Sequence, residues 1–386
     1  MQTQAPNKTK VLFIQPGYGH YRFPLYDMLH KNHDVTFVFI RSEQMYPSRL
    51  LPNPEWNKVF LDCTNSAFWV LKLAKLIVTI RPHVIISSIN GSCQTVTSVI
   101  MGRILQIPVI LWSISWDTSR FDSGRPYWRD VLSKRVVKWT TRNADAIVAG
   151  GKKSKKFNKK MAPAGKLIFT AYQSTGDLSL MTGIHTRAAN KINHIDGITV
   201  LYFSRIVEYK GLDILIHAFS EIEKGSKHAR LVVAGDGPFR EYCESLSRRL
   251  AVENITFYGG IQNEDAREFY KEADIFVLPC SGKNGTEAWG LVLNEATSMG
   301  LPIVTTDAVG AAGDLVEDGI NGYVVRAGSA SALRRAIEKL MADEDERQRM
   351  GRESRRLFES INSYKKMYEG FNSAIHEVVT DHHRQE

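Results

Sequence analysis

Two carboxylates stand eight positions apart in the stretch "GTEAWGLVLNEATSMG", where Glu287 lies in a glycine-flanked loop and Glu295 in the helix expected after it. The free N–H groups at a helix start, together with the helix dipole, favour an anion such as phosphate. Glu295 would lie roughly 7 Å along the helix axis from Gly290. Because carboxylates accept hydrogen bonds from hydroxyls, the pair suits a diphosphate with a hydroxyl-rich group at each end. A nucleotide-sugar, with its sugar and its ribose, has this form.

Two cations, Arg205 and Lys210, follow the strand-like run "VLYFS". Arg can chelate a diphosphate through two donors, and Lys can add a point charge. A solvated pair at a helix start would show the same residues, so the motif alone does not decide. Another strand-like run ends in "VVAGDGP", where Gly235 would allow close backbone approach to a ligand. An ordinary tight turn is the alternative there.

These residues need strands and helices to position them, and strand-like and helix-like segments alternate along the chain, which is typical of parallel α/β units. Strand candidates include 10–15 and 83–88 in the first half, and 197–204 and 274–279 in the second. Between the two series, residues 173–197 are polar and lack a clear period. Two Rossmann-like domains joined by a linker are therefore expected, with ligands at the carboxyl ends of their strands.

The composition limits the classes of protein to consider. A chain of 386 residues is too long for one core of ordinary size, and 43% hydrophobic with 24% charged residues is typical of a soluble globular protein. The four cysteines share no metal-ligand spacing, which favours a reducing compartment without structural zinc. The first residues lack the apolar core of a signal peptide, and the apolar run 66–80 is too short to span a bilayer.

The net charge of +9 is unevenly divided between the two halves. Residues 1–170 contain 25 Lys and Arg against 9 Asp and Glu, whereas residues 171–386 contain 25 against 32. Such a difference suggests that the first domain faces an anionic surface. Charge that serves only solubility is the alternative.

The second half resembles the retaining GT-B glycosyltransferases of family four, the glycosyl transferases group 1. Its run "EAWGLVLNE" is similar to their E-x7-E signature, whose usual form is E-x-[FY]-G-[LI]-x-x-x-E. Other motifs occur in the family's order, and together they are specific where a single one would not be. They are "FSRIVEYKGLDILIHAF", "LVVAGDGP", "ITFYGGIQNED", "ADIFVLPC" and "LVEDGINGYVV".

The resemblance implies a role for each of these residues. Arg205 and Lys210 would bind the donor diphosphate and, with Glu287 on the donor sugar, are the expected catalytic residues. Glu295 would hold the ribose hydroxyls. The other expected donor-binding residues offer amides to the phosphates, allow close backbone approach or lie beside the base: Trp289, Gly290, Leu291, Gly17, Gly19, Gly235, Gly260 and Ile261.

No cofactor or metal is expected, and the nucleotide-sugar is a substrate. The family transfers a sugar with retention of anomeric configuration, and Arg, Lys and the helix dipole neutralise the leaving diphosphate. The one D-x-D sequence, Asp343 to Asp345, lies in the charged segment "MADEDERQRM" and is interpreted as surface. The other glycosyltransferase fold would hold a metal through such a motif after a strand.

The fold implied is α/β of the GT-B type: two Rossmann-like domains facing across a cleft, with a C-terminal helix crossing back to the N-terminal domain. An apolar stripe in the last helix suits that docking and comprises Tyr364, Met367, Phe371 and Ile375. The expected parts are an acceptor-binding domain at 1–172, a linker at 173–197, a nucleotide-sugar-binding domain at 198–360 and the C-terminal helix at 361–386.

The N-terminal half matches the family less well. Its first loop, "QPGYGHYRFPLYD", resembles members that begin "P-x-x-x-x-Y-R-x-P" but lacks the double glycine of many relatives. Gly17 and Gly19 would let this loop approach a ligand. His20 and Arg22 would line the acceptor site. NAD binding is disfavoured, because Arg22 stands where a third glycine belongs and no acidic residue ends the second strand-like run.

The stretch "LWSISWDTSR" departs further from the family, since Ile114 and Ser115 replace the His-Gly that relatives often carry there. The role of that His therefore has no counterpart, and the expected acceptor contacts are Trp116 and Asp117, with Ser115 beside them. Core packing of Trp116 is the alternative. The difference leaves open an inactive or partner-dependent member of the family.

The acceptor side carries the excess positive charge. The segment "GGKKSKKFNKK", 150–160, holds six lysines and a Phe, which suits an anionic membrane surface, with an ordinary solvated helix as the alternative. For 66–80 a core helix is favoured over membrane contact. Family members often act on lipid-linked saccharides at the cytoplasmic leaflet, which implies a cytoplasmic protein peripheral on the inner face of the plasma membrane. No nucleic-acid motif accompanies the lysines, so nucleic acid is not an expected partner.

We therefore expect a retaining, metal-independent glycosyltransferase. It would move a sugar from a nucleotide-diphospho-sugar of UDP or GDP type to a glycan or lipid-linked saccharide in surface polysaccharide biosynthesis. A sugar-nucleotide epimerase of the same fold is one alternative, and it would need acids or bases near the sugar C2 and no acceptor surface. A non-catalytic GT-B protein that binds a nucleotide-sugar or a partner enzyme is the other, and Ile114 is its best argument.

Overall fold

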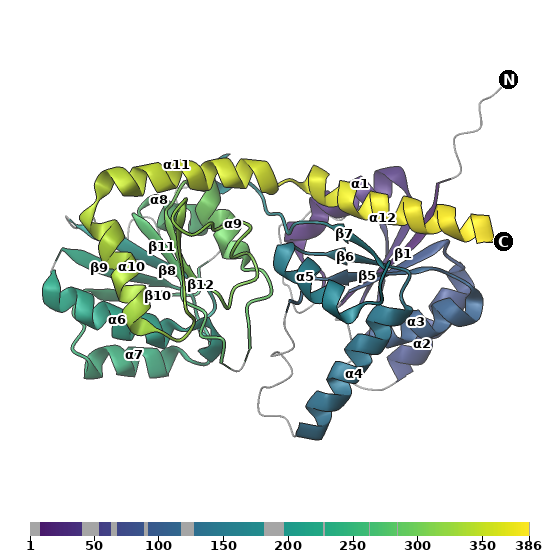
Figure 1. Cartoon of the computed structure of the whole chain (residues 1–386), viewed down its shortest axis with the longest axis horizontal. Coiled ribbons are helices and arrows are strands. Elements are labelled where there is room, and N and C mark those ends of the chain that lie inside the picture. The colour runs from purple at the N-terminus through teal and green to yellow at the C-terminus, as the bar shows by residue number, and fades with distance from the viewer. Residues whose placement is uncertain are drawn as a thin grey trace. The chain divides into compact units, whose positions relative to one another are not determined.

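The computed structural model divides the chain into two compact units (Figure 1). Unit 1 contains the described residues up to Gln173 and those from Ser363 onward, and unit 2 contains those from Ser174 to Asn362. The chain thus passes between the units at Gln173–Ser174 and again at Asn362–Ser363. The described stretches are 8–40, 54–62, 68–88, 92–116, 127–180, 197–226, 228–261, 263–283 and 285–385.

Within the described residues, unit 1 is built on a sheet of seven strands in the order β3-β2-β1-β4-β5-β6-β7. Every neighbouring pair is parallel, so each strand needs a crossover to reach the next. The strands are β1 (Lys10–Gln15), β2 (Asp34–Phe39), β3 (Asn57–Phe60), β4 (Val84–Ser88), β5 (Val109–Ser113), β6 (Ala146–Ala149) and β7 (Leu167–Thr170).

Different helices cover the two faces of this sheet, because side chains alternate along each strand. Phe13 and Trp112 belong to the core that includes side chains of α1 and α12, whereas Leu12 and Leu111 belong to the core that includes side chains of α2 and α3. The helices of unit 1 are α1 (Phe23–Asn32), α2 (Phe68–Ile80), α3 (Cys93–Leu105), α4 (Tyr127–Asn143), α5 (Lys152–Met161) and α12 (Tyr364–Gln385), with a 3-10 turn at His20–Arg22.

The last helix, α12, completes the core of unit 1 beside α1 (Figure 1). Met367, Phe371 and Ile375 are buried there, and the ring centroid of Phe371 lies 5.1 Å from that of Trp112. Tyr364 packs against the same core, and its hydroxyl donates to the carbonyl of Tyr21. The expected return of the C-terminal helix to the N-terminal domain is confirmed.

The described residues of unit 2 form a second sheet, of six parallel strands in the order β10-β9-β8-β11-β12-β13. The expectation of two Rossmann-like α/β domains is thereby confirmed. The strands are β8 (Ile198–Phe203), β9 (Ala229–Ala234), β10 (Ile255–Gly259), β11 (Ile275–Leu278), β12 (Ile303–Thr306) and β13 (Gly322–Val325).

Helices and short turns connect the strands of unit 2. A single core cluster holds apolar side chains of α6, α7 and α10 against β8, β9 and β11. The helices are α6 (Leu212–Gly225), α7 (Arg240–Arg249), α8 (Asn263–Lys271), α9 (Leu291–Ser298), α10 (Ala330–Ala342) and α11 (Glu344–Ile361), with 3-10 turns at Leu178–Leu180 and Glu208–Lys210.

Two interpretations of single segments have different outcomes. Asp343 and Asp345 are exposed, and the Asp343 carboxylate caps α11 by accepting from the amide of Glu346 at 2.9 Å, so their interpretation as surface residues is confirmed. The interpretation of 66–80 as a core helix is wrong for one face of α2. Phe68 and Leu71 on that face are 66% and 64% exposed, because the sheet covers only the opposite side of the helix.

Candidate active site

The sheet of unit 2 has a switch point between β8 and β11. From β8 the chain continues to β9 and β10 on one side, whereas β11 leads to β12 and β13 on the other. The loops after β8 and β11 therefore leave the carboxyl ends of adjacent strands, where open α/β sheets bind ligands. Arg205 and Lys210 follow β8, and Glu287 follows β11. The three expected catalytic residues thus lie in the two loops that flank this point.

Gly211 lets these two loops touch. Its φ of 72° is left-handed, and a Cβ there would lie 2.1 Å from the carbonyl oxygen of Pro279. Only glycine avoids that clash. Beside it, the amide of Ser281 donates to the carbonyl of Tyr209 at 2.9 Å. Lys210, the residue before Gly211, is thereby held against the loop that follows β11.

Lys210 and Glu287 form an ion pair, although 77 positions separate them in the sequence. Lys210 Nζ donates to Glu287 Oε2, and the two side chains are only 10% and 14% exposed. Burial alone would lower the pKa of Lys210, but the attraction of the Glu287 carboxylate outweighs burial and the pKa is raised. Lys210 is therefore charged. The cation expected on the diphosphate thus also fixes the carboxylate expected on the sugar.

The backbone of the Glu287 loop is held in place by its neighbours. Glu287 pairs with Val309 in a β-bridge, in which its N–H donates to Ala308 at 3.1 Å and its carbonyl accepts from Gly310 at 2.9 Å. Gly290 has a φ of 92°, and a Cβ there would lie 3.2 Å from Val309. The loop therefore enters α9 along a path that favours glycine at this position.

The start of α9 offers backbone donors. The N–H groups of Gly290 and Leu291 have no hydrogen-bond partner among the described residues, whereas that of Trp289 donates to Glu287 Oε1 at 3.4 Å. Two free amides at a helix start, with the helix dipole behind them, can bind phosphate. The Trp289 indole is 3% exposed, and its Nε1 donates to Asn294 Oδ1 at 2.8 Å. Its side chain therefore packs in the interior, and its expected contact with the donor is left to its backbone.

Glu295, in the second turn of α9, is half-buried. Its Oε2 accepts from the hydroxyl of the fully buried Tyr270 at 2.6 Å. Burial raises the pKa of Glu295, and the bond from Tyr270 opposes that rise only in part. Oε1 has no hydrogen-bond partner in the described part of the chain, so it can accept from a ligand hydroxyl. Sequence reasoning missed Tyr270, because its helical spacing from Ala266 indicates only a core residue.

Arg205 is exposed and forms no ion pair within the described stretches. The loop after β9 packs closely against the loop after β8, which carries Arg205. A Cβ on Gly235 would lie 1.9 Å from the Ser204 carbonyl oxygen. A Cβ on Gly237 would lie 2.3 Å from the carbonyl oxygen of Ile206. The close approach that Gly235 allows in this structure is thus to the chain's own backbone, as in a tight turn.

Gly260 and Ile261 follow β10, the edge strand of this sheet. Gly260 is exposed and Ile261 is half-buried. Two strand spacings, about 10 Å, separate β10 from β8. These two residues are therefore apart from the Lys210–Glu287 pair, and a ligand reaches both only if it extends across the ends of β8 and β9.

The expected acceptor residues belong to unit 1, as do two of the expected donor-binding residues, Gly17 and Gly19. Gly17 and Gly19 lie in the loop after β1, at the point where the sheet order of unit 1 switches from β1 to β4. His20 begins the 3-10 turn that leads to Arg22. Arg22 is half-buried, its Nη1 donates to Gln15 Oε1 at 2.6 Å, and its guanidinium carbon lies 4.4 Å from the ring centroid of Trp112. No carboxylate pairs with Arg22 among the residues that the structure describes.

Trp116 is half-buried, with Lys153 Nζ 4.6 Å from its ring centroid, which does not support simple core packing. Asp117 lies outside the described residues. Ile114 packs against the core of unit 1, and a Cβ on Gly150 would lie 3.2 Å from its Cα. The residue in the place of the family's His is thus an apolar packing residue.

The chain was compared with known proteins. Residues 185–357 match the family model described as Glycosyl transferases group 1. The chain is similar to a GDP-mannose-dependent alpha-(1-6)-phosphatidylinositol monomannoside mannosyltransferase of Mycobacterium tuberculosis, with 31% identity over 40% of each chain. It is also similar to the capsular polysaccharide biosynthesis glycosyltransferase CapM of Staphylococcus aureus, with 29% identity over 46% of each chain. The similarity thus spans less than half the length of these relatives.

Among solved structures, HepE of Anabaena in complex with UDP and glucose has a TM-score of 0.75 with 17% identity, over 96% of this chain and 100% of that one. This likeness shows that the chain has the same fold. The matched family model covers most of unit 2, including the loops that carry Arg205, Lys210 and Glu287. Residues 185–357 are thus similar to the glycosyl transferases group 1 family.

Proposed function

We propose that the protein is a retaining glycosyltransferase that moves a sugar from a nucleotide-diphospho-sugar to a glycan or lipid-linked saccharide acceptor. The observation that carries this proposal is the buried Lys210–Glu287 ion pair at the switch point of unit 2, beside the free amides that open α9. A cation and a carboxylate that touch each other suit a ligand whose anionic and hydroxyl-bearing groups are also adjacent. The diphosphate and the sugar of a nucleotide-sugar are adjacent in this way.

The chemistry follows from these groups. Arg205 and Lys210, with the amides of Gly290 and Leu291, would neutralise the diphosphate as it leaves, and positioned charges of this kind stabilise a developing anion. Glu287 would accept from hydroxyls of the donor sugar. In a retaining transfer the leaving diphosphate itself can take the acceptor proton, so the proposal needs no protein general base.

The relatives suggest two candidate bases for the donor nucleotide and support transfer over the alternatives. The mycobacterial relative is named for GDP-mannose, and the HepE structure holds UDP. We extend both to this chain as candidate donors. Because the relatives are named as transferases, transfer is favoured over epimerisation and over binding without catalysis. The name of CapM supports a role in surface polysaccharide biosynthesis.

Calorimetric titration with UDP, GDP, dTDP and ADP, in EDTA, tests the donor site and its independence of metal. One nucleotide is expected to bind with micromolar affinity, and the affinity should fall about tenfold or more in Arg205→Ala and in Glu295→Ala. Arg248→Ala, which removes an exposed Arg of α7, is the matched control and should bind like the wild type. A folded wild type that binds none of the four would overturn the proposal, and binding only after metal is restored would overturn its metal independence.

We also propose that unit 1 docks on an anionic membrane surface through α2 and α3, as a peripheral protein on the inner face of the plasma membrane. The two helices pack together and contain no Asp or Glu. Within the described residues, no helix is long enough and apolar enough to cross a bilayer. Exposed apolar and basic side chains lie together on these helices, which suits an interfacial surface: Phe68, Leu71, Val78, Ile100 and Ile104 with Lys72, Lys75 and Arg103.

Helix α5 supports this docking less well. Its lysines are largely exposed, but its Phe157 is half-buried and leaves little apolar surface to insert. Co-sedimentation with vesicles of phosphatidylglycerol or of phosphatidylcholine tests the proposal. Phe68→Ser with Leu71→Ser should abolish binding to the anionic vesicles, whereas Ile320→Ser, an exposed apolar change in unit 2, should not. Equal sedimentation of the double variant and the wild type would exclude α2 as the docking face.

A further inference from the structure

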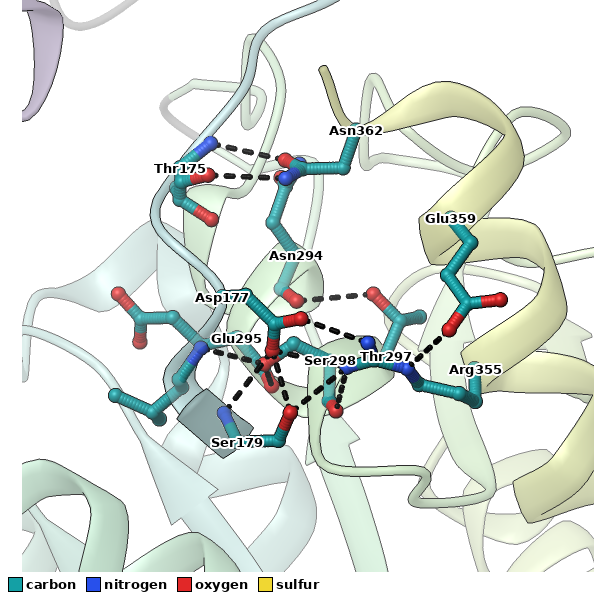
Figure 2. A network of polar contacts seen from close by, with 11 residues as sticks. Thr175, Asp177, Ser179, Asn294, Glu295, Thr297, Ser298, Arg355, Glu359 and Asn362 are labelled. Atoms are coloured by element: carbon teal, nitrogen blue, oxygen red, sulfur yellow. Dashed lines mark hydrogen bonds and ion pairs between the residues drawn. The ribbon is translucent and has the colours of Figure 1, made fainter. Parts of the chain in front are cut away.

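The side chain of Asn294 connects the donor loop to a distant part of unit 2. Asn294 is fully buried in α9, one residue before Glu295. Its Oδ1 accepts from the indole Nε1 of Trp289 at 2.8 Å, and its Nδ2 donates to Asn362 Oδ1 at 2.8 Å. Figure 2 shows Asn294 directed toward Asn362, which in turn faces Thr175.

Asn362 connects the two places in the described residues where the chain passes between the units. It is the last residue of unit 2, and Thr175 is the second residue after the chain enters that unit. Asn362 Oδ1 accepts from the Thr175 amide at 2.9 Å, and its Nδ2 donates to the Thr175 carbonyl at 2.9 Å. This reciprocal pair resembles the pairing of neighbouring strands, and it ties the two crossing segments to each other.

Only one orientation of the two amides satisfies this set of hydrogen bonds. The indole of Trp289 can only donate, so Asn294 must present Oδ1 to it and Nδ2 to Asn362. The backbone of Thr175 fixes the Asn362 amide in the same way, because its N–H and its carbonyl need opposite partners. A change at Trp289 therefore reaches Thr175 through two side chains that have no alternative arrangement.

A second contact holds the first crossing segment to the end of α9. Arg355 pairs with Asp177 through two hydrogen bonds, of 2.9 Å and 2.7 Å, and its Nη1 also donates to the Ser298 carbonyl at 2.9 Å. Ser298 Oγ donates to the carbonyl of Glu295 at 2.7 Å (Figure 2). The segment after Ser174 is thus attached to α9 at its middle and at its end.

We propose that Asn294 is a positioning residue that couples the donor loop to the two chain crossings, so that nucleotide binding beside Glu287 and Glu295 is transmitted to Thr175 and Asn362. The proposal rests on the proposed function for the nature of the ligand, but the relay itself is a property of the free protein. A buried donor or acceptor is costly to leave without a partner, so the linked groups are expected to move together.

Hydrogen–deuterium exchange of the nucleotide-free protein tests the relay without any ligand. In Trp289→Phe the indole donor is lost, so Asn294 keeps its hydrogen bond to Asn362 but loses the one that links it to the donor loop. Peptides covering 174–180 should then exchange about fivefold faster, the factor expected for one lost hydrogen bond. Ser360→Ala is the matched control. Ser360 lies near the end of α11, two residues before Asn362, and its hydroxyl donates to the Leu357 carbonyl, which is not part of the relay. Unchanged exchange at 174–180 in Trp289→Phe would overturn the proposal.

Asn294→Asp gives a second test, with a pH profile that a purely structural role would not produce. A neutral carboxyl can still accept from Trp289 and donate to Asn362, whereas a carboxylate can only accept. Turning Asn362 to meet the carboxylate would set its Oδ1 against the Thr175 carbonyl. The relay should therefore persist at low pH and be lost as pH rises through the pKa of the new carboxyl.

The measurement is nucleotide-induced protection of 174–180 relative to the donor loop. At saturating nucleotide, the wild type should show protection of both peptides at every pH, and Asn294→Asp should lose protection at 174–180 only at high pH. Protection at 174–180 that is the same in both proteins at all pH values would overturn the coupling. A wild type that binds no nucleotide would refute the proposed function, and the ligand-free comparison would still decide the relay.

Discussion

The two units each hold a cation at the switch point of their sheet, but they treat it differently. In unit 2, Lys210 is buried and paired with the Glu287 carboxylate. In unit 1, Arg22 is half-buried, rests over the Trp112 ring and bonds the neutral amide of Gln15, with no carboxylate partner among the described residues. The charge of Lys210 is balanced before any ligand binds, whereas among the described residues that of Arg22 is not.

This difference indicates how each site meets a ligand. Lys210 and Glu287 fix each other's position, so a donor finds a preorganised pair and the site depends on both members for its stability. Arg22 is positioned by stacking and by one neutral hydrogen bond, so it can gain an anionic partner without losing one. The first arrangement favours precise placement of a reacting group, and the second favours recognition of an anion.

The largest expected effect comes from breaking the ion pair. Lys210→Ala leaves the Glu287 carboxylate buried without its cation, which should cost about 3 kcal/mol in the free energy of unfolding of unit 2. It should also lower the transfer rate about 100-fold or more, because the leaving diphosphate loses a positioned charge. Urea unfolding and turnover measure the two effects.

The control for this prediction replaces both charges. Lys210→Met with Glu287→Leu should recover stability to within about 1 kcal/mol of the wild type, because an apolar pair of similar volume avoids the buried charge. Transfer should remain lost. If Lys210→Ala unfolds at the urea concentration of the wild type, the pair does not contribute to stability and the contrast between the units fails.

A smaller effect is expected at the exposed cation of the same site. Arg205→Ala should weaken nucleotide binding about tenfold, the size of one charge-assisted contact. The urea midpoint should not change, because Arg205 forms no ion pair in the described part of the chain. Arg205→Lys keeps the charge without the two-donor geometry and should lie between the two proteins in a calorimetric titration. Loss of stability in Arg205→Ala would contradict this assignment.

Tyr270→Phe should have a pH-dependent effect of about fivefold on nucleotide affinity. Burial already raises the pKa of Glu295, and the bond from Tyr270 lowers it, so the variant should raise that pKa further. If ribose hydroxyls are held by the ionised carboxylate, affinity is lost as pH falls through this pKa, and the loss should begin at a higher pH in the variant. Titrations between about pH 5 and 8 compare the two proteins. Identical pH profiles would mean that Tyr270 does not tune Glu295.

The smallest effect on stability and donor binding is expected from replacing Arg22, the cation at the switch point of unit 1. Arg22→Gln should change the free energy of unfolding by only about 1 kcal/mol, the typical value of a cation–π contact. Nucleotide affinity should not change, since the two cations proposed to bind the diphosphate, Arg205 and Lys210, belong to unit 2. Transfer to an anionic acceptor should fall while transfer to a neutral one is kept. If Arg22→Gln lowered the free energy of unfolding as much as Lys210→Ala does, the two cations would contribute equally to stability.

Much of the donor site is predictable from the sequence, because motif spacing places residues relative to strand ends. The positions of Arg205 and Lys210 after one strand and of Glu287 after another follow from local patterns alone. The contact between Lys210 and Glu287 does not, since it depends on the adjacency of β8 and β11 in the sheet. Strand order is a property of the whole unit, and no local period encodes it.

Other features of the structure cannot be predicted from the sequence, for related reasons. Tyr270 and Asn294 have apolar surroundings that indicate burial, but a hydrogen-bond partner of each lies far along the chain, 25 and 68 positions away, and only the folded chain identifies it. Helix α2 is apolar on nearly every side, so periodicity could not tell which face would be covered. A glycine such as Gly235 indicates that something approaches closely, without showing whether it is a ligand or the chain's own backbone.

The position of α12 has a consequence for biosynthesis. Phe371 of this helix packs between Phe13 and Trp112, so the core of the N-terminal unit contains side chains from the far end of the chain. On the ribosome, the contiguous segment from Ser174 to Asn362 emerges completely before α12 does. Domains generally fold as they are made, with the N-terminal domain first. Here the second unit can fold before the last helix of the first unit has been synthesised. Until then, the apolar surface around Trp112 is exposed in the nascent chain.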